Sequence, residues 1–398
     1  MNRILSLVSL LCSVSIAFAG SVVKVEDYPS LQAALDAVPA KGGLVVLPPR
    51  DFEITEPLVL TAEYTRIEGS GSSSHIINKN TEGKPALILR HKDYLTNKKA
   101  RNWRVNLSDF RISGTEKSGD GILAQGIQEI YVHGVSIDHH GGHGIHLEQC
   151  YEDPRVSDSI LTYNKKSGLH ITGGHDIVVN GNHFEENLDA VTCLDSFNLC
   201  MNGNNLDDHI RHGVVIENTY GSVLSGNMIE ECNDTAIILD RDCYGITLSA
   251  NVIAHHTGGG IKLLDAWGCT VSANTFVLVH HSSLYIGPES GRITVTGNNF
   301  SNSYIGGAIK RPVDHEKAMS RDEGTGIKLE GTRSITITGN TFSGLSTAAV
   351  QADEKTRQLI ISNNMVEDIG RGAEMPIKAF EITGVKGAVI KDNLLGVE

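Results

Sequence analysis

The sequence has few aromatic residues and no excess of basic ones. Phe, Trp and Tyr make up 5% of its 398 residues, and the formal net charge is −13. Without a basic surplus the chain cannot neutralise nucleic-acid phosphates, so we exclude a nucleic-acid partner. An acidic polysaccharide is not excluded, but local Lys, Arg or metal charge would have to face it. Charged residues are only 20% of the chain, which argues against a disordered protein.

Long apolar runs are absent after the first twenty residues, and we predict no membrane span. The start of the chain has the form of an export signal. Arg3 supplies the positive charge, residues 4–18 are apolar, and Ala17-Phe18-Ala19 is a small-residue cleavage site before Gly20. We therefore predict a signal peptide over residues 1–19 and a secreted or periplasmic mature protein.

Cysteine is scarce, and six cysteines remain once Cys12 leaves with the signal. An even number in an exported protein is compatible with disulfides. Cys150 and Cys243 fall in similar repeat positions four coils apart, which is too far to bridge. Cys193 lies within a predicted strand and should point inward. The sequence leaves two arrangements open, buried free thiols or at least one disulfide.

The dominant feature that is present is a repeat, most often 22–24 residues long. A β-branched run leads to a small residue, then Asn, then an apolar residue two positions later, as in residues 177–184, 293–300 and 335–342. A period of this size indicates a solenoid, whose length is not limited by one compact core. Weaker copies place Val135 and Ser159 in the Asn position. The Asn recurs at Asn182, Asn204, Asn227, Asn251, Asn274, Asn298, Asn340, Asn363 and Asn393.

Each coil has the same internal pattern. A Gly-Ile-x-Leu-like strand comes first, as in residues 144–147 and 260–263, and is followed by the strand that leads to Asn and by a third short strand. Three short strands per coil predict an all-β fold, a parallel β-helix in which equivalent residues stack about 4.8 Å apart. The Asn residues would then form a structural ladder at one turn.

We expect a single β-helix domain over residues 20–398. Near the start, an amphipathic helix over residues 28–38 should cap the first coil, because it carries Leu31, Ala34, Leu35 and Val38 on one face. The last coil has no evident cap, which leaves three alternatives for its open edge: oligomerisation with a partner chain, cover by a swapped tail, or simple exposure. The expected parts are an N-terminal cap over residues 20–70, irregular loops over 72–105, regular coils over 106–398, and a loop insertion over 303–324 that would cover a groove.

Strand alternation assigns the side chains that face solvent. In Gly-Ile-x-Leu, Ile and Leu point inward and x points outward. The x residues are Leu123, His146, His170, Thr192, Val215, Ile238, Lys262, Tyr285 and Lys328. The residues before each strand are Asp120, His143, Ser167, Asp189, His212, Thr235, Gly259, Ser282 and Thr325. The residues after it are Glu148, Thr172, Asp195, Glu217, Asp240 and Asp265.

These columns predict a catalytic or binding groove on one face. Fourteen of the seventeen histidines lie between His133 and His281, although any single one is more often a surface or turn residue. Three carboxylates on successive coils repel one another, so they would pair with Arg241 or bind a hard metal such as Ca²⁺. No other cofactor is implied. The predicted metal ligands are Asp195, Glu217 and Asp240.

The export signal, the Gly-Gly-x-Val-Val-x-Pro segment over residues 42–48 and the Gly-Asn-x-Phe coils resemble the right-handed parallel β-helix superfamily of pectate-lyase-like proteins. The resemblance covers roughly residues 22–398. It implies a right-handed solenoid that acts on polysaccharides as a lyase, glycoside hydrolase or uronate C5-epimerase, in a groove over the first strand of each coil.

Shorter motifs are similar to those of polygalacturonase-type hydrolases. Residues 187–191 are similar to their Asn-Thr-Asp-Gly motif, residues 211–213 and 142–144 to Gly-His-Gly, and residues 260–262 to Arg-Ile-Lys without the Arg. The order differs from that family, because the histidine motif at 142–144 precedes Asp189.

The favoured hypothesis is a secreted polysaccharide lyase or uronate epimerase that uses β-elimination chemistry. A base removes the proton next to a uronate carboxylate, and a cation stabilises the resulting charge. The alternatives are a polygalacturonase-like glycoside hydrolase with paired carboxylates, Asp189 with Asp208 or Glu217 with Asp240, and a non-catalytic glycan-binding or structural β-helix. The candidate catalytic residues are His146, His170, Asp189, His212, Asp240, Arg241, Lys262 and Tyr285. The candidate substrate contacts are His143, Asp208, His256, Lys310 and Arg311.

Overall fold

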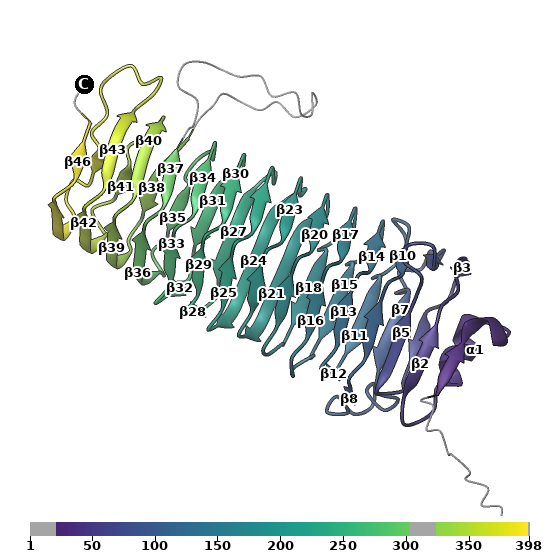
Figure 1. The fold of residues 1–398 in the computed structure, drawn as a ribbon. Coiled ribbons are helices and arrows are strands. Elements are labelled where there is room, and N and C mark those ends of the chain that lie inside the picture. The colour runs from purple at the N-terminus through teal and green to yellow at the C-terminus, as the bar shows by residue number, and fades with distance from the viewer. Residues whose placement is uncertain (1–20, 302–323, 397–398) are drawn as a thin grey trace, which may run out of the picture.

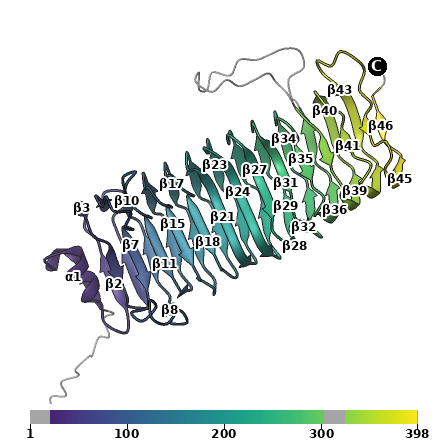
Figure 2. The same cartoon turned by 180° about the vertical axis from the view of Figure 1, so that it is seen from behind.

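A computed structural model of the chain describes residues 21–301 and 324–396. The signal peptide predicted over residues 1–19 lies outside the described residues, as do Lys310, Arg311 and nearly all of the insertion predicted over 303–324. The chain winds into a long rod of about 14 coils, with α1 at one end and the last strands at the other (Figures 1 and 2). Among the described residues, no helix has both the length and the apolarity that a membrane crossing requires.

Each coil contributes one strand to each of three parallel ladders, as the repeat predicts. The first ladder holds the Gly-Ile-x-Leu strands and consists of β4 (Leu58–Leu60), β7 (Leu87–Arg90), β11 (Ile122–Gln125), β15 (Ile145–Glu148), β18 (Leu169–Thr172), β21 (Asp189–Phe197), β24 (His212–Tyr220), β27 (Thr235–Asp240), β31 (Gly259–Leu263), β35 (Leu284–Ile286), β38 (Ile327–Leu329), β41 (Val350–Ala352) and β44 (Phe380–Glu381).

The second ladder holds the strands that lead to Asn. It consists of β1 (Val22–Lys24), β2 (Gly43–Val46), β5 (Thr65–Glu68), β9 (Asn106–Ser108), β13 (Tyr131–His133), β16 (Arg155–Ser157), β19 (Val178–Asn180), β22 (Cys200–Asn202), β25 (Val223–Ser225), β29 (Thr247–Ser249), β33 (Thr270–Ser272), β36 (Gly291–Thr296), β39 (Arg333–Thr338), β42 (Arg357–Ser362) and β45 (Lys386–Lys391). The short strands β28 (Cys243–Tyr244) and β32 (Ala266–Trp267) join it to the first ladder, because β28 pairs with β24 and β32 pairs with β36.

The third ladder follows the Asn turn. It consists of β3 (Asp51–Ile54), β6 (His75–Asn78), β10 (Arg111–Ser113), β14 (Ser136–Asp138), β17 (Ile160–Thr162), β20 (His183–Glu185), β23 (Asn205–Asp207), β26 (Met228–Glu230), β30 (Val252–Ala254), β34 (Thr275–Val277), β37 (Asn299–Ser301), β40 (Thr341–Leu345), β43 (Met365–Ile369) and β46 (Leu394–Leu395). A separate pair is formed by β8 (Asn102–Trp103) and β12 (Ile127–Gln128).

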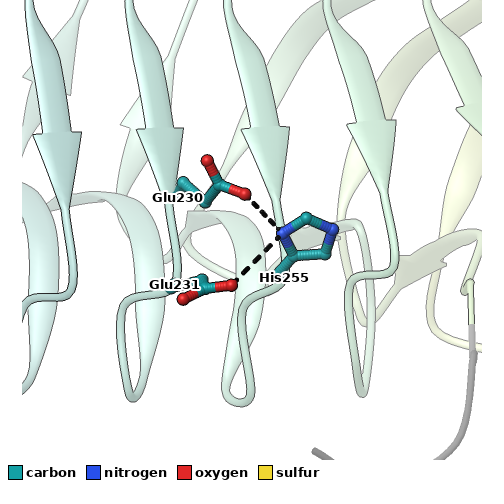
Figure 3. Close-up of side chains that lie close together, drawn as sticks. All are labelled: Glu230, Glu231 and His255. Atoms are coloured by element: carbon teal, nitrogen blue, oxygen red, sulfur yellow. Dashed lines mark hydrogen bonds and ion pairs between the residues drawn. The ribbon is translucent and has the colours of Figure 1, made fainter. Parts of the chain in front are cut away.

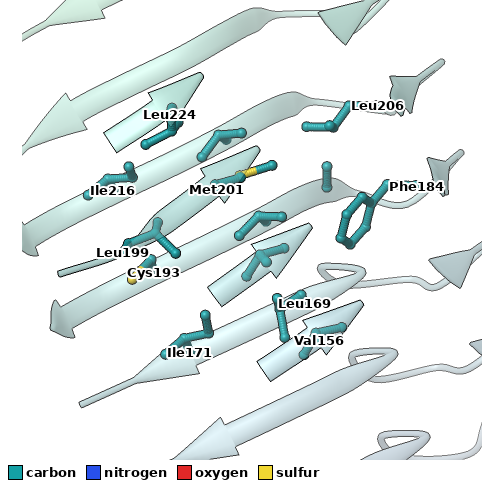
Figure 4. Close-up of a cluster of buried hydrophobic side chains, with 14 of the residues drawn as sticks. Val156, Leu169, Ile171, Phe184, Cys193, Leu199, Met201, Leu206, Ile216 and Leu224 are labelled. Carbon is teal, nitrogen blue, oxygen red and sulfur yellow. The ribbon is translucent and has the colours of Figure 1, made fainter. Parts of the chain in front are cut away.

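The core fills the space between the three ladders with side chains that repeat from coil to coil. Figure 4 shows part of this core around Leu169, Cys193 and Leu224. Phe276, Phe300 and Phe342 stack directly, with ring centroids 4.6 and 4.8 Å apart. Each fully buried side chain of this size stabilises the fold by about 1.5–3 kcal/mol, so every coil adds its own increment.

The Asn ladder is confirmed, with one correction. Each amide oxygen accepts the backbone N–H of the Asn one coil earlier, and Ser159 and Val135 extend the series as predicted. The position assigned to Asn363 belongs instead to Asn364, which accepts the backbone N–H of Asn340 at 2.9 Å. Asn363 precedes it with a φ of 55°.

The N-terminal cap is present but shorter than predicted. The helix α1 spans Leu31–Asp36, and Ser30 caps it by accepting the backbone N–H of Ala33 at 3.1 Å. A 3₁₀ turn, η1 (Val25–Asp27), precedes it. All four apolar residues predicted on its inner face are buried.

Two other expectations change. The stretch over residues 72–105 is not wholly irregular, because β6, β7 and β8 lie within it and β6 and β7 join the main ladders. The six cysteines from Cys150 to Cys269 are all free, which settles the choice that the sequence left open. Burial raises the pKa of the Cys193 thiol to about 11, so this inward-pointing group stays protonated.

We predict that Asn251→Ala lowers the free energy of unfolding by about 2–4 kcal/mol. The change removes an acceptor for the backbone and side-chain N–H groups of Asn227, at 3.0 and 2.9 Å, and leaves them buried and unpaired. Urea denaturation measures the loss. The matched control is Asn299→Ala, at an exposed position next to the ladder. Equal stability of the two variants would contradict a structural role for the ladder.

Candidate functional site

The outward residues of the first ladder form the candidate site, and we call this surface the site face. The structure confirms the predicted x column in register, from Leu123 opposite His146 to Tyr285 opposite Lys328. Asp189 and His212 are likewise paired in the column before the strands. The strand period of two and the coil period together place these residues correctly.

One group on this face is a cluster of three histidines around Asp120. The rings of His143 and His170 stack at 4.3 Å, and His146 lies 4.8 Å from His170. His146 Nδ1 is 3.2 Å from Asp120 Oδ2, and the backbone N–H of His143 donates to Asp120 Oδ1 at 2.7 Å. His170 Nδ1 is 2.6 Å from the hydroxyl of Thr192.

Burial keeps two of these imidazoles neutral. It is the largest cause that lowers the pKa of His143 to about 3 and of His170 to about 4, and the neighbouring imidazoles add to it. Burial opposes ionisation of Asp120, but hydrogen bonds from the His146 ring and the His143 backbone outweigh it and hold the pKa of Asp120 below its usual value. The Asp120 carboxylate therefore orients His146, whose side chain is 22% exposed.

Sequence reasoning missed a cation beside this cluster. Lys166 is exposed, and its charge lowers the pKa of both His143 and His170. It sits in the turn before β18, in line with Arg211 two coils further on. The number of residues between Lys166 and the repeat Asn of its coil, compared with the same count in other coils, would have placed Lys166 beside the cluster.

A second group of residues surrounds a hollow of about 630 Å³ at the far end of the site face. The ammonium group of Lys262 is 3.6 Å from Asp234 Oδ1, and Tyr285 lies between Lys262 and Lys328 in the x column. The full lining is Asp234, Gly258, Lys262, Leu264, His281, Ser282, Tyr285 and Lys328.

Glu330 orders one wall of this hollow. The hydroxyl of Tyr285 donates to Glu330 Oε2 at 2.8 Å, and Lys328 Nζ lies 2.7 Å from Oε1. Hydrogen bonds from Lys328 and Tyr285 lower the pKa of Glu330. Burial, followed by the hydrogen bond to Glu330, raises the pKa of Tyr285 to about 12, so the phenol keeps its proton at neutral pH.

The two groups do not meet. Five coils separate His146 from Lys262, which is about 24 Å at 4.8 Å per coil. Thr192, Val215 and Ile238 lie between them and carry no charge. Of the candidate catalytic residues, His146 and Tyr285 therefore cannot act on one sugar ring, whereas Lys262 and Tyr285 are neighbours.

Asp189 and His212 lie at the edge of the face rather than open to it. Asp189 is only 2% exposed, and Arg211 Nε donates to its Oδ1 at 2.9 Å. His212 Nδ1 accepts the backbone N–H of Thr235 at 3.4 Å, and burial lowers the pKa of His212. This geometry suits positioning of the turn, and it separates Asp189 from Asp208, its suggested partner in hydrolysis.

The predicted metal column differs by one residue from the observed register. Leu194, not Asp195, lies opposite Glu217, which pairs with Asp240 as expected. Asp195 has a left-handed backbone, with φ of 53°, and Asn218 on the next coil donates to its Oδ1 at 2.8 Å. Arg241 Nε lies 2.6 Å from Glu217 and Arg241 Nη2 lies 3.4 Å from Asp195, so these acids are paired by the predicted arginine. Beside the Glu217–Asp240 pair, the Arg241 guanidinium therefore already offsets negative charge.

The carboxylates that do gather lie at the end of the third ladder. Asp207 pairs with Glu230 in register, and Figure 3 shows Glu230 and Glu231 converging on His255. His255 Nδ1 is 2.7 Å from Glu230 and 3.8 Å from Glu231. Among the described residues, two sets have ligand atoms within 4.8 Å of one another, Glu230 with Glu231 and His255, and Asp207 with Asp208 and Glu231. These clusters could bind a metal, and the all-oxygen set suits Ca²⁺. Asp208 therefore belongs to this cluster and not to the site face.

The prediction that His256 contacts substrate is wrong. The residue is fully buried, with Nε2 3.0 Å from the carbonyl of Ile229, and burial lowers its pKa to about 4. It belongs to a second interior series at the turn before the first ladder, which sequence reasoning missed because His, Asn and Cys alternate in it. The series comprises His140, Asn164, Asn187, His209, Cys232 and His256.

We predict that Asp207→Asn stabilises the protein above pH 6 and has little effect near pH 4. Burial and then the charges of Asp208 and its acidic neighbours raise the pKa of Asp207 to about 6, against about 3.9 in an unfolded chain. Between these values the folded chain keeps a proton that the unfolded chain releases, so stability falls as the pH rises from 4 to 6. Melting curves in the presence of a chelator should show a rise of about 1–3 °C at pH 7. Asp153→Asn, at an exposed position, is the control, and an equal effect of both variants at all pH values would refute the charge cluster.

Comparisons with known proteins agree with this architecture. Residues 155–312 match the family model described as periplasmic copper-binding protein (NosD), and residues 235–395 match the right-handed β-helix region. No curated protein sequence matches the chain.

Several solved structures share the fold at low sequence identity. The A-module of the Azotobacter vinelandii mannuronan C-5 epimerase AlgE6 is 15% identical, with a TM-score of 0.53 over 94% of this chain and 99% of its own. The Arthrobacter chlorophenolicus DFA-IIIase without its lid is 13% identical, with a TM-score of 0.51 over 95% and 99%. The Streptococcus pneumoniae surface adhesin PfbA is 11% identical, with a TM-score of 0.52 over 88% and 91%. The match over residues 235–395 and these structural likenesses agree on the fold, a right-handed parallel β-helix, and identify no specific family.

Proposed function

We propose that the protein is an exported enzyme that acts on a uronate-containing polysaccharide, by β-elimination or C5-epimerisation, at the hollow around Tyr285. The observation that carries this proposal is the row Lys262, Tyr285, Lys328, which places a protonated phenol between two ammonium groups on adjacent coils. A hollow of this size is in the range of small-ligand sites.

The chemistry needs three roles, and the hollow supplies each. Lys262 and Lys328 lie near Asp234 and Glu330 and also line the hollow, where they would share their charge with the uronate carboxylate and make the adjacent C5 proton more acidic. His281 faces the same hollow and accepts that proton as an imidazole. The electron pair left on C5 spreads into the carboxylate, where the two lysines stabilise it.

Tyr285 completes either reaction. In elimination, the electron pair forms a double bond to C4 and expels the glycosidic oxygen, which takes the proton of Tyr285. In epimerisation, Tyr285 returns a proton to C5 from the opposite face. Its hydroxyl is protonated at neutral pH, and its place in the row between the two lysines is what supports this role.

The rest of the site face supports a linear substrate. The uncharged stretch over Thr192, Val215 and Ile238 leads from the hollow to the histidine cluster, where Lys166 offers a further contact for carboxylate. Export is supported by the sequence of residues 1–19 and by the match to a periplasmic family. The AlgE6 module is named as an epimerase of a uronate polymer, which is consistent with this choice of substrate.

A Ca²⁺ ion, if one binds, would be held by Asp207, Asp208 and Glu231. This cluster lies at the third ladder, so the cation would stabilise the coils rather than take part in the reaction.

A second location for the base is favoured by one observation, the contact between His146 and Asp120. A carboxylate that orients an imidazole is a common general-base device. The two locations make different predictions for mutants.

We predict that Tyr285→Phe lowers turnover by about 100-fold or more, because it removes the proton donor. The substrates are alginate and polygalacturonate, and the readouts are ultraviolet absorbance of the unsaturated product and deuterium incorporation at C5 from heavy water. Lys262→Gln should raise KM and also lower turnover, since it removes one contact to the carboxylate and to the charge that develops on it.

The control is Tyr64→Phe, an exposed tyrosine far from the site face. If His146→Gln abolishes turnover while Tyr285→Phe retains it, the reaction takes place at the histidine cluster. If wild-type protein incorporates no deuterium and forms no unsaturated product on either polymer, the proposed chemistry is wrong.

A further inference from the structure

Four of the few aromatic residues form a row on successive coils, and we call it the aromatic stripe. Phe197 lies opposite Tyr220, Tyr220 opposite Tyr244, and Tyr244 opposite Trp267. The stripe follows the turn at the end of the first ladder, where β28 and β32 lie along one edge of the rod (Figure 1). Phe197 is 42% exposed and Tyr244 57% exposed. Contiguous exposed patches of large side chains often mark binding sites.

Glycine lets the rings lie along the rod. A Cβ at Gly291 would come within 2.7 Å of the Trp267 ring, and one at Gly268 within 3.3 Å of Tyr244. Each of these rings therefore leans over the coil that follows it. Phe197 and Tyr220 are also in contact, with centroids 5.5 Å apart. Three steps between coils give the stripe a length of about 14 Å.

Polar groups border the stripe on the side of the site face. The hydroxyl of Tyr220 has two acceptors within reach, Asn218 Oδ1 at 2.8 Å and Asp242 Oδ2 at 3.2 Å, and Asn218 Nδ2 donates to Asp195 Oδ1 at 2.8 Å. Carboxylates and amides of this kind accept and donate hydrogen bonds to sugar hydroxyls.

Cations continue the row beyond the last ring. The guanidinium groups of Arg292 and Arg333 lie 5.9 and 5.1 Å from the Trp267 ring. Arg333 is followed in register by Arg357 and then Lys386, all of them exposed. A ligand that leaves the rings in this direction meets positive charge.

We propose that the aromatic stripe is a second glycan-binding track, which holds a polysaccharide chain parallel to the rod outside the reaction site. Sugar rings stack their apolar faces on the aromatic side chains, hydroxyl groups bond to the polar border, and carboxylates of a uronate chain reach Arg333 and Arg357. The stripe is one ring wide, whereas a stable protein interface needs about 800 Å² on each partner. A linear ligand fits this shape.

The track is separate from the site face. Val215 and Tyr220 lie on the same strand, β24, and the left-handed backbone of Asn218, with φ of 44°, turns the chain between them. Glu217, paired with Arg241, lies between them. The choice of a glycan rests on the proposed function, but the stripe needs none of the residues assigned to the reaction.

The test is affinity electrophoresis of the folded protein in gels that contain alginate, polygalacturonate or hydroxyethylcellulose. Tyr244→Ala and Trp267→Ala should each weaken retention by about 3- to 10-fold, in line with the loss of one stacked ring. The double variant should lose more. Tyr64→Ala is the matched control, since this tyrosine is 46% exposed and also lies near an arginine, Arg104 at 5.8 Å. Its retention should be unchanged.

Turnover distinguishes this proposal from the proposed function. The stripe variants should keep wild-type turnover on short oligosaccharides and show a raised KM on long polymers, whereas Tyr285→Phe should lose turnover and keep retention. Retention in the stripe variants equal to wild type overturns the track, whether or not the enzyme is active. Loss of self-association in the stripe variants, with no glycan retained by wild type, would also overturn it and identify a second copy as the occupant.

Discussion

The hydrogen bonds between successive coils are the constraint on which the rest of the molecule depends. They hold each residue opposite its equivalent one coil away, so a side chain chosen once is repeated at a spacing of about 4.8 Å. A repeated apolar residue forms a continuous core, and a repeated Asn satisfies its own amide through its neighbours, as Asn227 does with Asn251. The same register brings any exposed pair of like residues into contact. The hydrogen-bond register between coils therefore aligns the residues of a candidate site and also brings like charges close together.

The register places like charges on neighbouring coils, where they repel one another. The structure reduces this repulsion in three ways. At Glu217 and Asp195 an arginine bridges the coils. At the histidine cluster burial removes the charge, and the pKa of His143 falls to about 3. At Asp207 burial and the neighbouring carboxylates disfavour the ionised form, and the pKa of Asp207 rises to about 6. The third case is the one where a cation would change the balance, because oxygen ligands already lie within reach of one another.

The sequence predicted residue positions correctly where the strand alternation and the coil spacing both hold. It failed where a residue interrupts the strand alternation. The x column from His146 to Lys328 was placed correctly, because the alternation of a strand and the spacing of the coils both fix it. Asp195 was misplaced by one residue, because it has a left-handed backbone within β21 and so interrupts the strand alternation. Asn363 and Asn364 were confused for the same kind of reason. His256 looked like a surface residue because its polarity hides an interior position.

The hollow and the aromatic stripe were harder to foresee because neither is periodic in residue type. The hollow combines Lys, Tyr, His and Asp from turns and strands of neighbouring coils, and only their positions in space relate them. The row holds Phe, two Tyr and Trp, followed by Gly291 and then Arg333, so no single residue type marks it. It becomes visible once the register is known, since each residue is opposite the next.

The long axis of the rod also limits what can bind. Every column of side chains on a β-helix runs along that axis, so a site built from successive coils presents the same direction to its ligand. A short ligand would contact one or two coils and leave most of a column unused. A polymer can contact many coils at once, and each added contact is gained without a new loss of translational freedom. The site face and the aromatic stripe are two such columns on one rod, and both therefore favour a linear chain over a compact partner.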